Sequence, residues 1–574
     1  MNRTATLSDK RVLILDAEFP SALTILRSLS RQGIHCDIAS AQNKPISEFS
    51  RFAKQVFIYP DPLTDTHAFI DAICRLLQEY HYDLIIPVTE RTLIPLSASP
   101  QLDPWRDSLA IADKKALALV LDKAKTLQLA VQCGVHTPFS HTVASFSDIE
   151  RLASSLDYPV VIKPGQSIPN ADIRRQLSVA YAHSAEQLRQ LSEPLLASCQ
   201  LLIQEYAQGI GTGVEILANH GEIVYAFQHE RLHELPLTGG GSCLRKSIAV
   251  NAVLLEASRK LIKALNWHGV AMVEFKWLPD TDKYWLMEIN GRFWGSLPLA
   301  YAAGADFPKM LFDLWVLKKL PAAQDYKKEV YCRKLTADLH WLEQVLRRSD
   351  RSDLIQYPSK KSIMKDCLLA LHPTRHFFDI QCWSDPAPGM VDGFSFIHAQ
   401  SLRVFELLRY KALLRWHSSS FIRHRLQKRI KIAKQVLFLC YGNINRSALA
   451  QVLVEHTVSS DTQFYSAGFH HPDKRPADSN MVEVAANNGI DLTNWQSTTL
   501  NAEWVAKSDL ILAMEIAHLD RLITEYPQAK NKAFLLGTLI ANSNDVEIRD
   551  PYNQKSEVYK QVFKQIESAV RQII

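Results

Sequence analysis

The 574-residue sequence has no run of about 18 consecutive apolar residues, the length that crosses a bilayer as a helix. Its start lacks the charged and then apolar layout of a secretory signal. Its nine cysteines show neither CxxC pairs nor regular spacing, so neither a zinc site nor a disulfide framework is indicated. We therefore expect a cytoplasmic protein in which most cysteines are small buried hydrophobic residues.

A strong charge bias of either sign is also missing over the chain as a whole. The net charge of +5 is too mild for this length to indicate a nucleic-acid partner, and none is expected. Hydrophobic residues make up 47% and charged residues 22%, which is close to the average for globular proteins. The length exceeds what one core usually organises, so several domains are expected.

The first 112 residues predict a doubly wound α/β domain. An apolar strand at 12–16, an amphipathic helix that ends near Gly33 and an extended segment at 35–39 form a β-α-β pattern, and a buried strand follows at 82–88. The segment after the first strand reads DAEFPSA and lacks the glycine-rich turn of a dinucleotide site. Dinucleotide binding is therefore not supported.

The rest of the chain divides by its patterns into three further parts. Residues 113–330 alternate helices with strands and predict a second α/β or α+β body. Residues 331–432 predict a mixed helical connector that ends in a basic segment. Residues 433–574 return to strand-helix alternation.

A cysteine follows an apolar strand at 436–439 and opens a short loop before a segment with helical spacing. The loop reads Cys440-Tyr-Gly-Asn-Ile-Asn-Arg446-Ser447. A strand-to-helix turn aims backbone N–H groups and the positive end of a helix at one point, which suits a phosphate dianion and a nucleophilic thiolate. The planar fork of Arg446 can bind two phosphate oxygens, and Ser447 can hydrogen-bond the thiolate. Taken alone, Cys440 could equally be a buried core cysteine.

The same reaction needs an acid that protonates the departing oxygen. Asp550, in the segment Arg-Asp-Pro-Tyr near the end of the chain, is the candidate. It would act first as general acid and then as general base for water.

These residues resemble the low-molecular-weight protein tyrosine phosphatases, whose loop has the form C-x-G-N-x-x-R-S and whose acid lies in a D-P-Y/F motif. The resemblance spans nearly all of the last 140 residues and implies that Asn443 also takes the family's role. Asn445 stands where many members have a second cysteine, and Trp495 replaces the usual histidine. Arsenate reductases share the loop, but they need further cysteines for a disulfide cascade, and none follows Cys440.

A second constellation lies upstream, on two segments that predict a β-hairpin. Glu288 and Asn290 are two residues apart and therefore lie on one face of a mostly apolar strand. The turn LPDTDK folds the strand of Glu274 back beside it. Three oxygen ligands then meet in a site of the kind that magnesium prefers beside nucleotide phosphates.

Two lysines and one polar segment complete this set. Lys123 opens a helix after Leu-Asp, and Lys163 ends the strand PVVIK, so both could hold ATP phosphates as point charges. Gln204, Glu205 and Tyr206 follow an apolar run and would present backbone and side-chain groups to adenine. Each of these residues taken alone could equally be an ordinary surface residue.

The ordered set resembles the ATP-grasp superfamily, in particular its carbamoyl-phosphate-synthase-like and biotin-carboxylase-like branch. The resemblance covers residues 1–330 and implies a pre-ATP-grasp α/β domain at 1–112 and two α+β lobes at 113–330 that bind ATP. It implies Mg²⁺ or Mn²⁺ on Glu274, Glu288 and Asn290, and an acyl phosphate stabilised by Arg292. The glycine cluster 239–241 is predicted to be a loop over the substrate, or a plain hairpin turn.

The basic connector is the strongest local charge bias. Nine lysines and arginines and no acidic residue lie between positions 409 and 434. A helix from position 420 would be amphipathic. It could make weak contact with an anionic membrane, or be a solvated linker helix that docks between domains.

Taken together, the sequence predicts an α/β multidomain, bifunctional enzyme. An N-terminal ATP-grasp ligase, with the helical connector at 331–432, precedes a phosphatase at 433–574 whose parallel sheet is flanked by helices. The ligase would join an unidentified carboxylate to an amine or similar nucleophile through an acyl phosphate. The phosphatase would hydrolyse phosphotyrosine in a protein, or another phosphomonoester, through a cysteinyl phosphate. The alternatives are an ATP-grasp half that only senses nucleotide and regulates the phosphatase, or one that is a scaffold.

Overall fold

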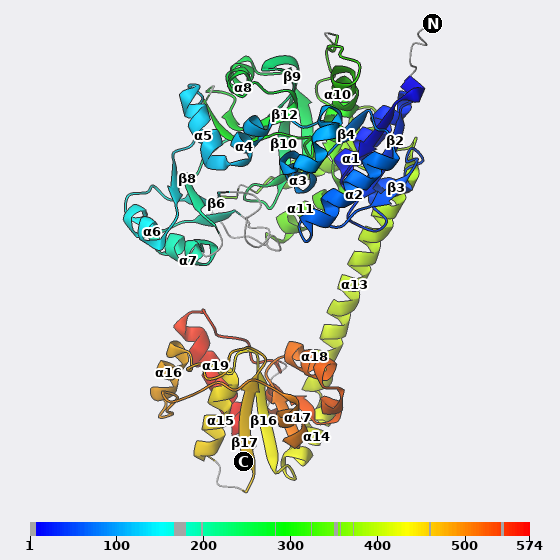
Figure 1. The fold of residues 1–574 in the computed structure, drawn as a ribbon. Coiled ribbons are helices and arrows are strands. Elements are labelled where there is room, and N and C mark those ends of the chain that lie inside the picture. The colour runs from blue at the N-terminus through cyan, green and yellow to red at the C-terminus, as the bar shows by residue number, and fades with distance from the viewer. Residues whose placement is uncertain are drawn as a thin grey trace. The chain divides into compact units, whose positions relative to one another are not determined.

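The computed structural model describes residues 7–165, 179–196, 199–281, 283–322, 324–348, 354–355, 357–370, 372–457, 461–540 and 545–573. The chain forms two compact units, Met1–Phe396 and Ile397–Ile574. The helix α13 (Pro386–Ser418) contains the boundary between them (Figure 1). No helix among the described residues is both long and apolar enough to span a membrane.

The first unit begins with a parallel sheet in the order β3-β2-β1-β4. Its strands are β1 (Arg11–Ile14), β2 (His35–Ser40), β3 (Val56–Ile58) and β4 (Leu84–Ile86). Alternate residues of β1 face different cores: Val12 and Ile14 pack in the cluster with α1 (Pro20–Arg31), whereas Leu13 packs with α2 (Thr66–Glu79) on the other side. This two-sided burial makes the domain doubly wound, as predicted.

A second sheet of the first unit is antiparallel, in the order β5-β8-β6-β7. Its strands are β5 (Ser140–Val143), β6 (Val160–Pro164), β7 (Ala180–Ala182) and β8 (Leu201–Glu205). The helices α6 (Phe146–Ala153) and α7 (Ala185–Leu196) contribute Ile149 and Leu188 to its core. This sheet carries Lys163 and Gln204 on adjacent strands.

The third sheet is the largest in the described part of the chain and has the order β13-β12-β9-β10-β11-β14-β15. Its strands are β9 (Ile210–Asn219), β10 (Glu222–Leu235), β11 (Gly241–Ile248), β12 (Gly269–Leu278), β13 (Lys283–Asn290), β14 (Tyr331–Arg333) and β15 (His376–Phe378). The pairs among β9 to β13 are antiparallel. β14 and β15 lie in the predicted helical connector, yet they extend this sheet.

Helices cover both faces of this large sheet. The helices that share a core with one face are α4 (Lys114–Leu121), α5 (Lys123–Gln132) and α8 (Ala252–Ala264). The helices α9 (Leu297–Ala302) and α10 (Phe307–Trp315) pack in the cluster that also contains β1 and α1. The remaining helices of this unit are α3 (Glu90–Ala98), α11 (Leu335–Arg347) and α12 (Lys360–Leu369).

The second unit has a parallel sheet in the order β17-β16-β18-β19. Its strands are β16 (Gln435–Cys440), β17 (Gln463–Gly468), β18 (Leu510–Ala513) and β19 (Ala533–Leu535). Its helices are α14 (Ser420–Ile430), α15 (Arg446–Thr457), α16 (Ser479–Ala486), α17 (Ala502–Lys507), α18 (Ile516–Glu525) and α19 (Ser556–Val570). Phe438 and Leu437 on β16 face two different cores, so helices flank both faces of the sheet.

The predicted fold class is therefore confirmed: the chain is an α/β multidomain protein with a parallel, helix-flanked sheet at its C-terminal end. The basic helix α14 belongs to the second unit, because Ile422 and Leu426 are buried in its core. The four domain boundaries that the sequence suggests stay predictions.

Candidate active sites

The Cys440 loop connects the end of β16 to the start of α15, as its position in the sequence predicts. Cys440 is 2% exposed. Its Sγ accepts a hydrogen bond from the backbone N–H of Asn443 at 3.2 Å and lies 2.9 Å from Oγ of Ser447. The sulfur is thus surrounded by donors that stabilise negative charge.

Asn443 fixes the shape of this loop from behind the sulfur. Its backbone is left-handed, with φ of 51°, a conformation that asparagine adopts more readily than most residues. Its Nδ2 donates to Oγ of Ser447 at 2.9 Å and to Oγ of Ser466 at 2.8 Å, and its Oδ1 accepts from the backbone N–H of Thr498 at 2.7 Å. The amide therefore holds Ser447 in contact with Cys440.

Arg446 is almost fully buried at the start of α15. Its Nη1 donates to Glu515 Oε2 at 2.7 Å and to the carbonyl of Ile548 at 2.9 Å, and its Nη2 lies 2.8 Å from Asp550 Oδ2. Burial acts to lower the pKa of Arg446, but Cys440, Asp550 and Glu515 together raise it. Its Nε is buried and has no hydrogen-bond partner among the described residues. The cation is therefore held in place through both of its Nη atoms.

A cavity of about 230 Å³ opens at this loop. Its lining residues are Cys440, Tyr441, Gly442, Ile444, Asn445, Arg446, His470, Arg475, Asp550 and Tyr552. Three predicted site residues, Cys440, Arg446 and Asp550, thus come together at one cavity. Asn443 and Ser447 are fully buried behind it.

Two lining residues, His470 and Arg475, were not predicted from the sequence; both come from the segment after β17. Arg475 donates through Nη2 to the carbonyl of Gly442 in the loop and through Nε to the carbonyl of Pro472. Arg475 therefore adds a second guanidinium to the cavity. The segment Lys-Arg-Pro around Arg475 is typical of an ordinary turn, so nothing in the sequence indicates that Arg475 belongs to the site.

Gly468 and Trp495 contact the backbone of the Cys440 loop. A Cβ atom on Gly468 would lie 2.7 Å from the carbonyl oxygen of Tyr441 and 2.8 Å from the backbone nitrogen of Asn443, so only glycine fits there. Trp495, the departure noted in the sequence, donates from Nε1 to the carbonyl of Asn443 at 2.8 Å.

The second predicted constellation lies on the large sheet of the first unit. Glu274 on β12 is paired directly with Glu288 on β13 in an antiparallel ladder. Asn290 donates from Nδ2 to Glu274 Oε1 at 2.9 Å and to Glu288 Oε1 at 3.2 Å. The three predicted side chains therefore meet on one face, as the two-residue spacing predicts, but Asn290 turns its amide nitrogen rather than its oxygen towards the two carboxylates.

Two lysines lie near these carboxylates, one at the start of a helix and one on a strand. Lys123 Nζ, at the start of α5, lies 3.8 Å from Glu288 Oε2. Lys163, on β6, donates to Gln204 Oε1 at 2.6 Å. Burial, together with the neighbouring Lys123, lowers the pKa of Lys163 to about 8. Both lysines that the sequence predicted are thus near the same carboxylates.

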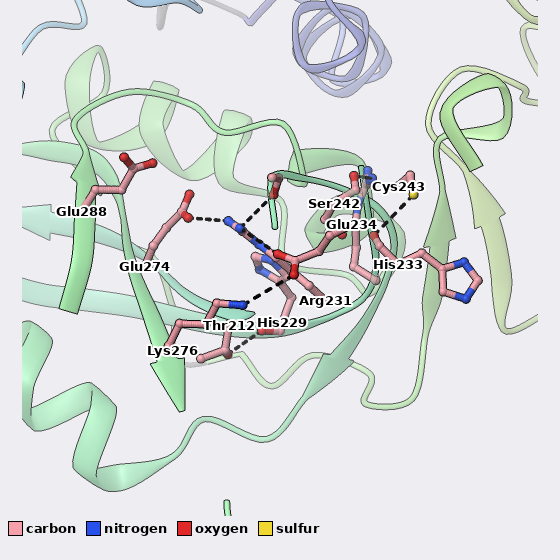
Figure 2. A network of polar contacts seen from close by, with 12 residues as sticks. Thr212, His229, Arg231, His233, Glu234, Ser242, Cys243, Glu274, Lys276 and Glu288 are labelled. Carbon is pink, nitrogen blue, oxygen red and sulfur yellow. Dashed lines mark hydrogen bonds and ion pairs between the residues drawn. The ribbon is translucent and has the colours of Figure 1, made fainter. Parts of the chain in front are cut away.

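Arg231 on β10 is the central cation of this network, although its position in the sequence does not predict a place in the site. Figure 2 shows its guanidinium between Glu274 and Glu234, with which it forms ion pairs. Its Nη1 also donates to the carbonyl of Gly240 at 3.2 Å. Burial acts to lower the pKa of Arg231, and the two glutamates raise it. Lys276 on β12 lies 3.5 Å from Glu234 and adds a further cation.

The chemistry of this donor set fits a hard divalent cation. Burial raises the pKa of Glu274, Arg231 acts to lower it and the facing carboxylate of Glu288 acts to raise it, so a divalent cation between the two glutamates would relieve their repulsion. Burial acts to raise the pKa of Glu288 as well, but Lys123 and Lys163 lower it below its usual value. The described residues hold no cluster of three His, Cys, Asp or Glu that suits a metal, and the predicted third ligand here is an asparagine.

Three predicted adenine contacts lie on β8 and just after it. Gln204 is buried and bridges Lys163 to Ser140, to which its Nε2 donates at 2.9 Å. Glu205 is exposed and lines a cavity of about 590 Å³ with Leu202. Tyr206 lies with its ring 6.2 Å from that of Tyr181.

Arg292, the predicted acyl-phosphate contact, follows β13. It donates from Nη1 to the carbonyl of Phe293 at 2.9 Å and from Nη2 to Glu90 Oε1 at 3.2 Å. Glu90 begins α3 of the doubly wound domain. A residue of that domain therefore reaches the candidate ATP-grasp site.

Two family models match separate parts of the chain. The model described as "Low molecular weight phosphotyrosine protein phosphatase" matches residues 435–574. The model described as "ATP-grasp in the biosynthetic pathway with Ter operon" matches residues 197–337. The two regions predicted from residue patterns are thus recognised independently.

Individual relatives agree with the phosphatase match. The low molecular weight protein-tyrosine-phosphatase Etp of Escherichia coli K12 is 34% identical over 134 residues, which are 23% of this chain and 88% of that protein. The protein-arginine-phosphatase of Geobacillus stearothermophilus is 29% identical over 136 residues, which are 24% of this chain and 90% of that protein.

Among solved structures, L-amino acid ligase from Bacillus licheniformis aligns with a TM-score of 0.44 and 17% identity over 56% of this chain and 78% of that one.

Proposed function

The chain belongs to the low molecular weight phosphotyrosine protein phosphatase family through residues 435–574, and from that premise we propose that Cys440 is the nucleophile of a phosphomonoester hydrolase. One observation carries this proposal. Cys440, Arg446 and Asp550 line a single cavity of about 230 Å³. Nucleophile, phosphate-binding fork and proton donor are the three groups that the reaction needs.

In the first step, Cys440 Sγ attacks the phosphorus atom and the bond from phosphorus to the leaving oxygen breaks. Asp550 donates its proton to that oxygen. Arg446 and the backbone N–H groups of the loop hold the remaining phosphate oxygens. The products of this step are the free alcohol or phenol and a cysteinyl phosphate.

In the second step, Asp550 takes a proton from water as the water oxygen attacks phosphorus. The sulfur-phosphorus bond breaks, and inorganic phosphate leaves. Ser447 supports this departure because its Oγ lies 2.9 Å from Sγ and can donate to the returning thiolate. Asn443 positions Ser447 through its Nδ2.

Phosphotyrosine is the proposed substrate class, and phosphoarginine is the competing class because one relative is named a protein-arginine-phosphatase. Tyr441 and Tyr552 line the cavity and are about half exposed, so they can pack against a phenyl ring. Arg475 places a positive charge in the same cavity, which opposes a guanidinium group. Both features favour phosphotyrosine.

Steady-state kinetics with matched phosphotyrosine and phosphoarginine peptides tests this choice. We expect the larger kcat/KM for phosphotyrosine. The variant Arg475→Gln should raise the relative rate with phosphoarginine, whereas Arg521→Gln, on the exposed side of α18, serves as the matched control. Faster wild-type hydrolysis of phosphoarginine would reverse the assignment.

For the first unit we propose an ATP-dependent ligase that activates a carboxylate as an acyl phosphate and lets an amine or related nucleophile displace phosphate. The direct pairing of Glu274 with Glu288, beside Lys123 and Lys163, supports it. Bound Mg²⁺ or Mn²⁺ would neutralise charge on the ATP phosphates, and Glu274, Glu288 and Asn290 would hold it.

The side chains of this site have different binding roles. Lys123 and Lys163 bind ATP phosphates, and Gln204, Glu205 and Tyr206 bind adenine. Arg231 and Arg292 are the cations available to the transferred phosphoryl group and the carboxylate. The alternative of a nucleotide sensor predicts binding of ATP without its consumption.

Measuring ADP release over a panel of carboxylates and amines separates these two roles. The variant Glu288→Gln should abolish ADP release and leave hydrolysis of an aryl phosphate unchanged, because the two sites share no residue. Glu256→Gln on the exposed face of α8 is the matched control. ATP binding with no turnover for any substrate pair would support the sensor.

A further inference from the structure

The helix α13 exposes an unusual amount of apolar surface. It runs for 33 residues, and its buried residue is Pro388. Large apolar side chains along it are between 51% and 67% exposed: Met390, Phe394, Ile397, Leu402, Val404, Phe405, Leu407 and Leu408. Exposed apolar surface of this extent marks an interaction site.

Six positions of α13 form one seam along the helix. They are Met390, Phe394, Ile397, Ser401, Val404 and Leu408. The steps between them alternate between four and three residues, which is the heptad spacing of a coiled coil. Five of the six side chains are large and apolar. Such a seam suits knobs-into-holes packing against another helix.

The charged residues of this stretch lie away from the seam. Asp392, Arg403, Glu406 and Arg409 fall on the opposite side of the helix. Within the second unit, Arg409 pairs with Asp520 at 2.6 Å. Positions flanking the seam, such as Phe405 and Leu407, carry no charge. Two copies of the seam can therefore approach each other without placing like charges face to face.

The available area matches what a stable pair needs. The five large apolar side chains of the seam, with Phe405 and Leu407 beside it, each expose on the order of 100 Å², which gives roughly 700 Å² per copy and approaches the ~800 Å² that each partner buries in a standard protein interface. Aromatic and aliphatic side chains supply nearly all of it.

We propose that the seam of α13 binds the seam of a second copy of this chain in antiparallel orientation. In a parallel pair, Lys411 and Arg415, the next two positions of the seam, would each face the same residue of the other copy. Like charges would then meet. Antiparallel pairing centred on Ala399 sets Met390 opposite Leu408 and Phe394 opposite Val404, and the remaining pair sets Ile397 opposite the small Ser401.

An anionic membrane is the competing occupant, because this region also carries the basic connector. Several of its cations already have partners within the second unit. Arg409 pairs with Asp520, and Arg423 donates from Nε to the carbonyl of Thr538 at 2.9 Å. The apolar residues Ile422 and Leu426 of α14 are buried in a core. The structure thus favours a protein partner over lipid.

Light scattering of the full chain during size-exclusion chromatography tests the proposal. We expect a mass twice that of one chain at micromolar concentration. The double variant Val404→Glu/Leu408→Glu should be monomeric and should keep its aryl phosphatase activity. Ala399→Glu, an exposed position on the opposite side of the helix, is the matched control and should remain dimeric.

A monomeric wild-type chain would overturn the proposal. Flotation of that monomer with phosphatidylserine vesicles, lost in Val404→Glu/Leu408→Glu, would assign the seam to a membrane instead. A dimer that persists in the double variant would place the interface elsewhere.

Oxidative crosslinking tests the orientation separately. Chains that carry Phe394→Cys and chains that carry Val404→Cys are purified, mixed and oxidised, with the wild type measuring the background from native cysteines. Antiparallel pairing predicts crosslinked dimers in the mixture and background levels for each variant alone. Crosslinking of each variant with itself would show parallel pairing and overturn the proposed orientation.

Discussion

Asp550 Oδ2 lies 2.8 Å from Arg446 Nη2, so the proposed proton donor and the proposed phosphate-binding residue form one ion pair. Arg446 keeps separate anchors, because its Nη1 donates to Glu515 and to the carbonyl of Ile548. A bound phosphate competes with Asp550 for Nη2. Arrival of the substrate would therefore release the Asp550 carboxyl group beside the leaving oxygen, while Glu515 keeps the guanidinium in place.

The variant Asp550→Asn tests the proton-donor role. It should slow the first step strongly for phosphotyrosine and much less for p-nitrophenyl phosphate, because a good leaving group needs little proton donation. Burst kinetics must resolve this step, since Asp550 also activates water in the second step. Equal slowing of the burst for both substrates would remove Asp550 from the acid role.

Cys440→Ser separates binding from chemistry. A serine hydroxyl in this loop is a poor nucleophile without an adjacent base, so turnover should fall to background. Inorganic phosphate should still bind through Arg446 and the backbone donors, as measured by calorimetry. The variant Arg446→Lys is the contrast: it keeps the charge but loses the planar fork, and should weaken phosphate binding. Retained turnover in Cys440→Ser would contradict the account.

The lowered pKa of Lys163 predicts a pH dependence for ATP binding. Free Lys163 loses its proton near pH 8, and phosphates bind the protonated form, so they raise its pKa when they bind. The contribution of Lys163 to ATP affinity should be fully present well below pH 8 and be lost as the pH rises above 8. Calorimetry at pH 9 in buffers of different ionisation enthalpy should show proton uptake on binding. Lys163→Arg should flatten the profile, because arginine stays charged; an unchanged profile would contradict the assignment.

The buried residues of α14 predict a difference between two fragments. Fragment 433–574 lacks Ile422 and Leu426, which are 2% and 0% exposed, whereas fragment 397–574 retains them. Loss of each buried side chain lowers the free energy of unfolding by about 1.5–3 kcal/mol. Urea unfolding should therefore find fragment 433–574 several kcal/mol less stable, although it contains every proposed catalytic residue. Equal stability would show that α14 is not part of that core.

The parts of the sites that sequence reasoning found are those with a local signature. Cys440, Arg446 and Ser447 lie within eight residues, and the strand-to-helix turn that contains them follows from hydrophobic spacing. Glu288 and Asn290 share a face because strands alternate with period two, and a short turn pairs them with Glu274. In both cases the geometry is set by neighbours along the chain.

The parts that sequence reasoning missed depend on contacts between distant segments. Arg231 meets Glu274 across the sheet from 43 residues away, and Glu515 reaches Arg446 from 69 residues away. Such pairs look like separate surface charges in the sequence. The strands β14 and β15 are three residues long and show no readable period, so their addition to the large sheet could not be predicted.

The most direct test of the central claim is to trap the phosphoenzyme. The full chain is mixed with an aryl phosphate, quenched in acid within the burst and digested, and the peptides are analysed by mass spectrometry. The account predicts one added phosphoryl group on the peptide that contains Cys440, and none in Cys440→Ser. A phosphoryl group on any other residue, or turnover with a burst but no labelled Cys440, would contradict it.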